Sequence, residues 1–242
     1  DVTVALGTSG SATEGTDYTD GSGNIDDITI SAGATTGTVS FTPTDDSTYE
    51  DDETATIAIT GVSGGGATES GTQTVTITIS ENESAPTVAL SVSATSIAEN
   101  AGSSLTLTAT LSGAANEAVT VSLSTSSTAT EGTDYTDGSG NIDDITISAG
   151  STTGTVNFTP TDDSVYEGNE TAGISVSGVS GGSASESGTQ AVTITITENE
   201  SAPTVTLATS ATSIAENAGS SLTLTATLSV ATTADVTVSL ST

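Results

Sequence analysis

The chain repeats itself at one fixed offset of 117 residues (131 − 14), with no insertion between the copies. Three motifs return unchanged: Glu-Gly-Thr-Asp-Tyr at positions 14 and 131, Glu-Asn-Glu-Ser-Ala-Pro at 81 and 198, and Ser-Ile-Ala-Glu-Asn at 96 and 213. Solenoid repeats span about 20–50 residues, so a period this long indicates whole domains. We predict a complete unit over residues 86–201. The C-terminal part of one unit (residues 1–85) precedes it, and the N-terminal part of another (residues 202–242) follows it.

Each unit has the pattern of short β-strands. Residues 105–111 alternate leucine or alanine with threonine, which places the apolar side chains on one face of a strand. Comparable runs occupy residues 87–92, 118–123, 142–147, 154–158, 171–179 and 190–197. Because no helical period interrupts them, these runs predict an all-β chain of antiparallel β-sandwiches. The short linker 198–203 ends in proline, so we expect domains stacked end to end with little freedom between them.

The charge excludes several classes of partner. The chain has 31 acidic residues and no Lys, Arg or His, which gives a formal net charge of −31. Nucleic-acid phosphates and anionic membranes are both bound through Lys and Arg, so neither is expected as a partner. No apolar run has the length of a membrane span, so membrane insertion is not expected either.

Catalysis is equally hard to assemble from these residues. A serine or threonine nucleophile needs a histidine or lysine base, and the chain has neither. A pair of carboxylates would suffice for a glycosidase. However, such enzymes hold sugars on aromatic side chains, and this chain has no Trp and an aromatic content of only 2%. We therefore expect that the protein is not an enzyme.

Acidic residues concentrate in the stretch between two predicted strands, Thr159–Glu170. Four carboxylates lie within nine residues there, at Asp162, Asp163, Glu167 and Glu170, with no basic side chain to neutralise them. Like charges this close repel strongly unless a cation joins them. A hard divalent ion is the natural candidate, because Ca²⁺ takes six to eight oxygen ligands. Ca²⁺ is accordingly the cofactor that we expect.

Three patterns together resemble the Calx-beta domain, an immunoglobulin-like module found in sodium–calcium exchangers and in large bacterial surface proteins. They are Ile-Ala-Glu99-Asn, Gly-Thr-Asp134-Tyr, and Asp162-Asp163 followed by Glu167 and Glu170. Through its repeats the resemblance covers the whole chain. It implies tandem immunoglobulin-like β-sandwich domains and a calcium site at one pole of each domain.

The resemblance also implies which acids meet at that pole. In the complete unit these are Glu99, Asp134, Asp162, Asp163, Glu167, Glu198 and Glu200. The matching residues of the first unit are Asp17, Asp45, Asp46, Glu50, Glu81 and Glu83, and the third unit supplies only Glu216. The calcium-sensing members carry an aspartate run at the exit strand, where this chain has Glu-Asn-Glu at 198–200. That departure leaves the number of ions open.

A second acidic segment has a different interpretation. Residues 137–143 place oxygen-bearing side chains at alternate positions, as an EF-hand loop does. However, Ile142 stands where the EF-hand has its glycine, and the twelfth position is Ser148 instead of glutamate. We predict a hairpin turn there.

Together these features favour a non-catalytic structural repeat of an extracellular fibre or adhesin, stiffened by Ca²⁺ at the poles between domains. Neighbouring repeats, in the same chain or in identical chains, are the expected partners, with a cell-surface or matrix ligand elsewhere in the parent protein. The expected location is extracellular or at the cell surface, as a segment of a longer secreted array. Two alternatives stay open, namely a calcium-sensing regulatory module and a filament subunit that assembles head to tail by strand complementation.

Overall fold

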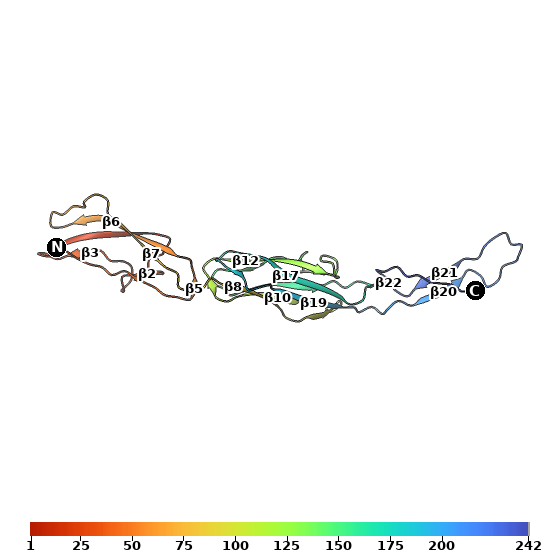
Figure 1. Ribbon diagram of the computed structural model, residues 1–242. Helices are drawn as coiled ribbons and strands as arrows, with labels where there is room; N and C mark the ends of the chain where they lie inside the picture. The colour runs from red at the N-terminus through yellow and green to blue at the C-terminus, as the bar shows by residue number, and fades with distance from the viewer. Residues whose placement is uncertain (242) are drawn as a thin grey trace.

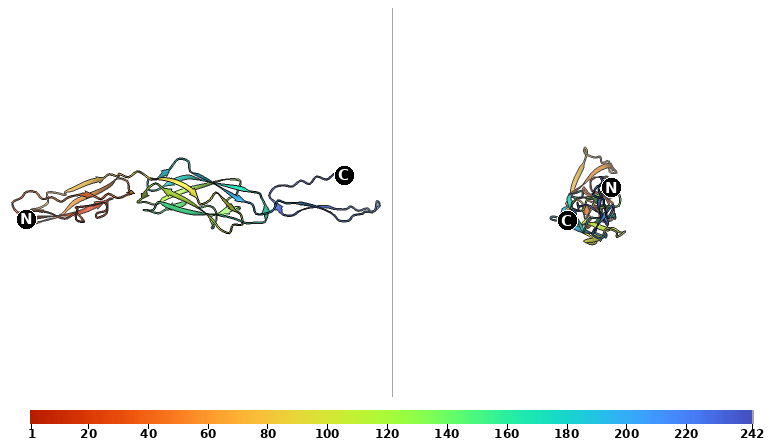
Figure 2. Two further views of the ribbon diagram at one scale, coloured as in Figure 1. Left: turned by 90° about the horizontal axis from the view of Figure 1, so that it is seen from below. Right: turned by 90° about the vertical axis from the view of Figure 1, so that its right-hand side faces the viewer.

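The computed structural model describes residues 1–241, and within that range every regular element is a β-strand. The strands form three consecutive groups that follow one another along an elongated molecule, with the first and last groups at opposite ends (Figures 1 and 2). Within residues 1–241, no helix could serve as a membrane span. The prediction of an all-β chain of stacked sandwiches is confirmed.

The central group is a sandwich of two five-stranded sheets, with strand orders β13-β15-β10-β8-β18 and β14-β12-β17-β19-β9. The first sheet contains β8 (Thr87–Val92), β10 (Leu105–Leu111), β13 (Tyr135–Thr136), β15 (Thr153–Pro160) and β18 (Ser185–Glu186). The second sheet contains β9 (Ser96–Ala98), β12 (Val119–Ser127), β14 (Ile145–Ile147), β17 (Glu170–Ser180) and β19 (Ala191–Thr197). Most neighbouring strands are antiparallel, as the alternating pattern predicted.

Two edge pairs are parallel, and one of them shapes the acidic pole. Residues 96–98 do not continue the strand that precedes them. Instead, β8 pairs with β10 in one sheet, while β9 crosses to the other sheet and pairs in parallel with β19. In the register of that pair, Ala98 lies opposite Thr197. Because parallel strands run in the same direction, Glu99 and Glu198 leave the sheet side by side.

The core of the central group lies between the two sheets. It is built of small aliphatic side chains, with Leu107, Ile174 and Ile194 fully buried. The largest buried pair is aromatic, since the ring of Tyr135 stacks on Phe158 with centroids 4.6 Å apart. Asp134 directly precedes Tyr135, and the acidic stretch 159–170 directly follows Phe158, so this stack positions acidic residues from both segments.

The first group has one main sheet, whereas the central group has two. Its main sheet has the order β3-β1-β6-β7, made of β1 (Val2–Gly10), β3 (Ile28–Ile30), β6 (Glu53–Ser63) and β7 (Thr74–Ile79). A small ladder joins β2 (Tyr18–Thr19) to β4 (Thr42–Pro43). The third group is a hairpin of β20 (Val205–Thr209) and β21 (Leu224–Leu228).

Short parallel ladders connect the groups. At the first junction β5 (Thr48–Tyr49) pairs with β11 (Ala114–Ala115), and at the second β16 (Val165–Tyr166) pairs with β22 (Ala231–Thr232). The two ladders are equivalent at the 117-residue offset (165 − 48). In each case the strand that reaches across belongs to the acidic loop of the preceding group.

Candidate metal centre

Three carboxylates meet where the chain leaves the central sandwich. Ligand oxygens of Glu99, Glu198 and Glu200 all lie within 4.8 Å of one another. Glu99 follows β9 and Glu198 follows β19, so their proximity is a direct result of the parallel pairing of those strands. The backbone N–H of Glu99 also donates to the carbonyl of Thr197 at 3.0 Å.

Glu99 is the buried member of this cluster, with only 7% of its surface exposed. One of its oxygens, Oε1, accepts a hydrogen bond from the backbone N–H of Asp163 at 3.1 Å. Burial, together with the nearby carboxylates of Glu198, Glu200 and Asp163, raises the pKa of Glu99 to about 7. A buried carboxylate surrounded by other carboxylates is unfavourable unless a proton or a cation compensates its charge.

Glu198 anchors the acidic loop to the exit strand. Its Oε2 accepts hydrogen bonds from the backbone N–H groups of Glu167 at 2.6 Å and Gly168 at 2.7 Å. Its Oε1 accepts from the N–H of Glu200 at 3.0 Å. Burial alone would raise the pKa of Glu198, but these donors outweigh it and hold the pKa at about 2. Glu198 therefore stays charged throughout the physiological range.

A second set of three carboxylates lies in the same acidic region. Ligand oxygens of Asp134, Glu167 and Glu170 lie within 4.8 Å of one another. Asp134 comes from the loop before β13, and Glu170 is the first residue of β17. Burial, followed by the charges of Asp134 and Glu167, raises the pKa of Glu170 to about 7. The charge of Asp163 contributes to the raised pKa of Glu99 in the first set and of Glu167 in the second, so the two sets are neighbours.

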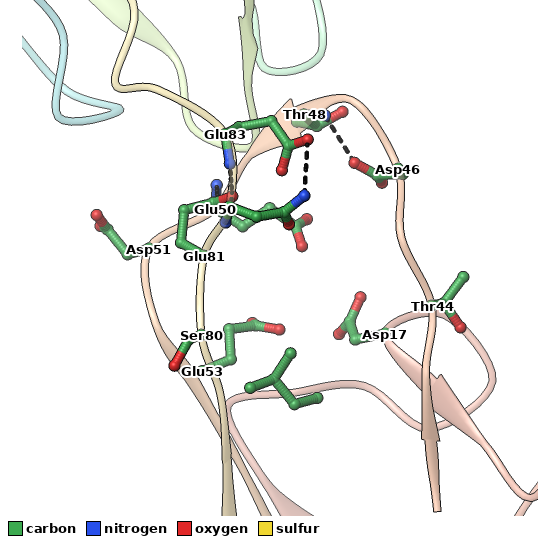
Figure 3. A pocket seen from close by; sticks show the side chains of 12 residues that line it. Asp17, Thr44, Asp46, Thr48, Glu50, Asp51, Glu53, Ser80, Glu81 and Glu83 are labelled. Atoms are coloured by element: carbon green, nitrogen blue, oxygen red, sulfur yellow. Dashed lines mark hydrogen bonds between the residues drawn. The ribbon is translucent and has the colours of Figure 1, made fainter.

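The first unit repeats the second set. Asp17, Glu50 and Glu53 correspond to Asp134, Glu167 and Glu170 and lie within the same 4.8 Å limit. They line a cavity of about 40 Å³, and Figure 3 shows Asp17 and Glu53 reaching into it from opposite walls. Burial, followed by the charge of Asp17, raises the pKa of Glu53 to about 7.

The remaining predicted acids lie near these sets but outside them. Asp163 Oδ1 accepts from the N–H of Val165, and Asp162 Oδ1 accepts from the side-chain amide of Asn199 at 3.2 Å. In the first unit Asp46 accepts from the N–H of Thr48. Three further predicted residues also engage neighbouring groups: Asp45 accepts from Asn82, Glu81 accepts from the N–H of Glu83, and Glu83 accepts from Asn82. Glu216 is exposed.

Two residues of the clusters were not among the predicted site residues. Glu170 was recognised as part of the acidic stretch but not assigned to the site, and Glu53 was not considered. Their sequence position could have identified them. Glu170 lies three residues after Glu167, Glu53 lies three residues after Glu50, and each begins a long strand. Only the structure shows that this first residue of the strand points to the pole.

The segment that resembles an EF-hand loop is a local turn, but it is not the hairpin that was predicted, because the strands on either side of it, β13 and β14, lie in different sheets. Asp137 Oδ1 accepts hydrogen bonds from the backbone N–H and the hydroxyl of Ser139 and from the N–H of Gly140. These bonds lower the pKa of Asp137, and they occupy the oxygen that a cation would need.

The clusters fit a calcium ion in chemistry and in size. Every donor is a carboxylate oxygen, which is the ligand type that Ca²⁺ prefers. Two ligands on opposite sides of an ion, each about 2.4 Å from it, are about 4.8 Å apart. Buried Oε2 of Glu200 has no hydrogen-bond partner among the described residues. An unpaired buried carboxylate oxygen beside buried Glu99 indicates a missing positive partner.

The Calx-beta domain family model matches residues 1–83 and again residues 81–200. The chain belongs to the Calx-beta domain family. Calx-beta domains are non-catalytic, calcium-binding modules, which agrees with the expectations that the protein is not an enzyme and that its cofactor is Ca²⁺. Comparison with curated protein sequences gives no match.

Solved structures of Calx domains are also similar to this Calx-beta chain. The apo-form Calx CBD1 domain is 18% identical, covering 47% of this chain and 99% of its own, with a TM-score of 0.39. CBD12 from CALX1.2 is 14% identical over 81% of this chain and 86% of its own, with a TM-score of 0.36. The calcium binding domain CBD12 of CALX1.1 is 17% identical over 72% of this chain and 66% of its own, with a TM-score of 0.27. Because these sequence identities and TM-scores are low, the assignment to the Calx-beta family depends on the family model alone.

Proposed function

We propose that the chain is a structural repeat in which Ca²⁺ at the pole of each Calx-beta domain stiffens the junction with the next domain. One observation carries this proposal. Glu198 and Glu200 belong to a carboxylate cluster, and they are also the first residues of the linker that leads to the next unit. An ion held by Glu99, Glu198 and Glu200 therefore ties the linker to the body of the domain.

The acidic loop provides a second structural link between the metal centre and the next unit. Glu167 directly follows β16, and β16 pairs with β22 of the third group. Since Glu198 already holds the N–H of Glu167, a cation that restrains Glu167 restrains the strand that crosses the junction. Binding at the pole and ordering of the junction are thus linked by neighbouring residues.

The first junction has a comparable arrangement. The N–H of Asn116 donates to the carbonyl of Tyr49 at 3.0 Å, which extends the ladder between β5 and β11. A cavity of about 350 Å³ lies between the units and is lined by Tyr49, Glu83 and Gly113, among others. The acidic loop of the first unit therefore contacts the next unit through Tyr49.

Charge explains why the cation is required. With 31 acids and no bases, the chain repels itself, and the repulsion is greatest where carboxylates cluster at the junctions. Calcium neutralises the clusters and removes that repulsion locally. We propose an extracellular or cell-surface setting, where calcium is abundant, and a role as a spacer in a fibre or adhesin. Its partners are neighbouring repeats, with a surface or matrix ligand elsewhere in the parent protein.

A calcium-sensing regulatory module is the second candidate, because calcium binding by a Calx-beta domain is compatible with a regulatory response as well as with a structural role. The near-identical copies in this chain favour the structural role instead, because a regulatory response does not require repetition. The two candidates differ in whether calcium narrows the range of orientations between domains.

Thermal unfolding in 2 mM CaCl₂ and in excess EDTA, combined with small-angle X-ray scattering, tests the proposal. A ligand at 100 times its Kd adds about 2.7 kcal/mol of stability, which raises the Tm by several degrees for domains of this size. We expect this rise and a narrower, longer distance distribution in calcium. Both should be reduced in Glu99→Gln, which removes the buried ligand of one cluster, and kept in Asp26→Asn, an exposed acid outside the clusters.

Two outcomes would decide against the stiffening role. Identical unfolding curves in calcium and EDTA would mean that the acidic clusters are simply solvated. A calcium-dependent rise in Tm without any change in the distance distribution would favour the regulatory module over the stiffened spacer.

A further inference from the structure

At three positions with a positive φ, one copy of the repeat has a glycine and the other copy has a larger residue. Every described residue other than glycine that has a positive φ belongs to this group. The pairs are Asp51 with Gly168, Ser127 with Gly10, and Ser183 with Gly66. Glycine adopts a positive φ without steric cost, whereas a side chain there is unfavourable. A larger residue at such a position is therefore a candidate for a specific contact.

Two of these three side chains meet across the first junction. The hydroxyl of Ser183 donates to Oδ1 of Asp51 at 3.1 Å. Asp51 belongs to the acidic loop of the first unit, and Ser183 belongs to the central unit. The central unit has Gly168 in place of Asp51, and the first unit has Gly66 in place of Ser183. The hydrogen bond thus joins two residues at which the neighbouring units differ from each other.

Tyr49 holds the carboxylate of Asp51 at the junction. Its hydroxyl donates to the same Oδ1 at 2.6 Å, and its strand β5 pairs with β11 of the central unit. Asp51 is not a member of the carboxylate set of the first unit. Figure 3 shows its side chain directed away from Asp17 and Glu53. Asp51 therefore accepts from two hydroxyl groups, and hydrogen bonds to a charged acceptor are stronger than those between neutral groups.

The central unit presents Ser183 on a closely packed surface. Ser183 follows Gly182, which is buried. A Cβ atom at Gly182 would lie 2.7 Å from the Cβ of Ala115, so the loop packs directly against β11. The N–H of Ala184 donates to the carbonyl of Gly181 at 3.1 Å, which closes the turn. The turn 181–184 and β11 together form one surface that faces the preceding unit.

We propose that Asp51 and Ser183 form a latch, a contact specific to this junction that aligns the two units without calcium. The recognition surface is the turn 181–184 with β11. Its partner is the acidic loop of a preceding unit that carries an acid at the position of Asp51. A unit with glycine at that position, as the central unit has at Gly168, lacks the acceptor. Junctions in such an array then differ in stiffness according to the residues at these two positions.

The latch goes beyond the proposed calcium function and does not depend on it. Calcium would restrain the acidic loop through the carboxylate sets, whereas the latch joins two side chains outside those sets. Because the contact is exposed, we expect it to act on the relative orientation of the units more than on their unfolding.

Pulsed electron spin resonance between one label in each unit tests the latch. The chain has no cysteine, so Thr29→Cys and Thr146→Cys provide the two labelling sites. Both threonines are exposed, and they occupy equivalent positions in β3 and β14. Ser183→Gly should widen the distribution of distances between the labels, both in calcium and in EDTA.

Ser127→Gly is the matched control. It also replaces a serine of positive φ by the glycine of the other copy. However, β12 begins at Val119, beside Gly182, and ends at Ser127. Those eight residues (127 − 119) span about 26 Å of strand, so Ser127 is remote from the latch. Equal distributions in Ser183→Gly and Ser127→Gly would overturn the proposal.

A double substitution tests whether the two residues act as a pair. Once Asp51→Gly has removed the acceptor, adding Ser183→Gly should cause no further widening. Additive widening would mean that each residue acts independently, which would overturn the pairing.

Calcium separates the latch from the proposed stiffening. Widening by Ser183→Gly in EDTA supports the latch even where calcium leaves the distribution of the unaltered chain unchanged, a result that would contradict the calcium proposal alone. Widening in calcium but not in EDTA would overturn a latch that acts without calcium.

Discussion

Glu198 Oε2 accepts a hydrogen bond of 2.6 Å from the backbone N–H of Glu167, which joins the exit of one domain to its acidic loop. The neighbouring N–H of Gly168 donates to the same oxygen at 2.7 Å. One carboxylate thus holds two adjacent backbone N–H groups of the acidic loop, and the same residue belongs to a cluster of candidate cation ligands. This residue couples the linker, the loop and the metal centre.

The first prediction concerns this coupling. Glu198→Gln should lower the free energy of unfolding by about 1–2 kcal/mol, because hydrogen bonds to a charged acceptor are stronger than those to a neutral amide. Calcium affinity should fall by at least tenfold, since a charged ligand is lost. Thermal unfolding and calorimetric titration measure the two effects. Asp26→Asn is the charge-matched control, and equal effects of the two substitutions would contradict the role of Glu198.

The second prediction concerns pH in the absence of calcium. The pKa values of Glu99 and Glu170 are raised to about 7 from a usual value of 4.5 by burial and by neighbouring carboxylates. Between those values the folded chain binds more protons than the unfolded chain, so its stability falls as pH rises. In EDTA the Tm should be lower at pH 7.5 than at pH 5.5. Glu198 does not contribute to the change of stability between pH 5.5 and pH 7.5, because its pKa of about 2 keeps it ionised over that range.

Calcium should reverse this pH dependence. The ion requires ionised carboxylates, so its affinity should rise between pH 5.5 and 7.5 and binding should release protons. Titration calorimetry in buffers of different ionisation enthalpy measures the released protons. A Tm in EDTA that is flat or rises over this range would contradict the assignment of Glu99 and Glu170.

The third prediction concerns the first junction. The carboxylate of Asp51 accepts hydrogen bonds from the hydroxyl of Tyr49 at 2.6 Å and from Ser183 of the next unit at 3.1 Å. Asp51 has a positive φ of 58°, and its counterpart in the repeat is Gly168. Asp51→Gly therefore removes the contact without backbone strain. We expect a broader distribution of distances between the units, with or without calcium.

Spin labels on cysteines placed in each of the two units measure that distribution, because the native chain has no cysteine to interfere. The effect should be modest, since one such hydrogen bond contributes about 0.5–1.5 kcal/mol. An unchanged distribution in Asp51→Gly would show that the ladder between β5 and β11 alone sets the orientation.

The fourth prediction concerns the thin core. Phe158→Ala should lower the stability of the central unit by about 3–5 kcal/mol, because Phe158 is fully buried and its ring stacks on Tyr135. Leu240→Ala is the control, since Leu240 is 59% exposed and should have little effect. Chemical denaturation of the monomer measures both. Similar losses for the two variants would contradict the placement of the core.

Much of the fold follows from local patterns in the chain. The alternation of apolar and polar residues in 105–111 is sufficient to identify a half-buried strand, and the structure buries Leu107 and Leu111 as that pattern requires. Local patterns do not show which of the two sheets residues 96–98 join. A strand that crosses between sheets has the same alternation as one that continues straight, so pairing with β19 could not be predicted.

Sequence alone determined the 117-residue period, the all-β class, the lack of any basic partner for the acids, and the choice of oxygen ligands suited to calcium. These depend on composition and on short-range spacing. Tertiary structure decided which acids meet, joining Glu99 to Glu198 and Glu200, and Glu170 to Asp134 and Glu167. The reason is that residues far apart in the chain become neighbours only when strands pair and their ends converge at one pole. Spacing along the chain does not encode that pairing.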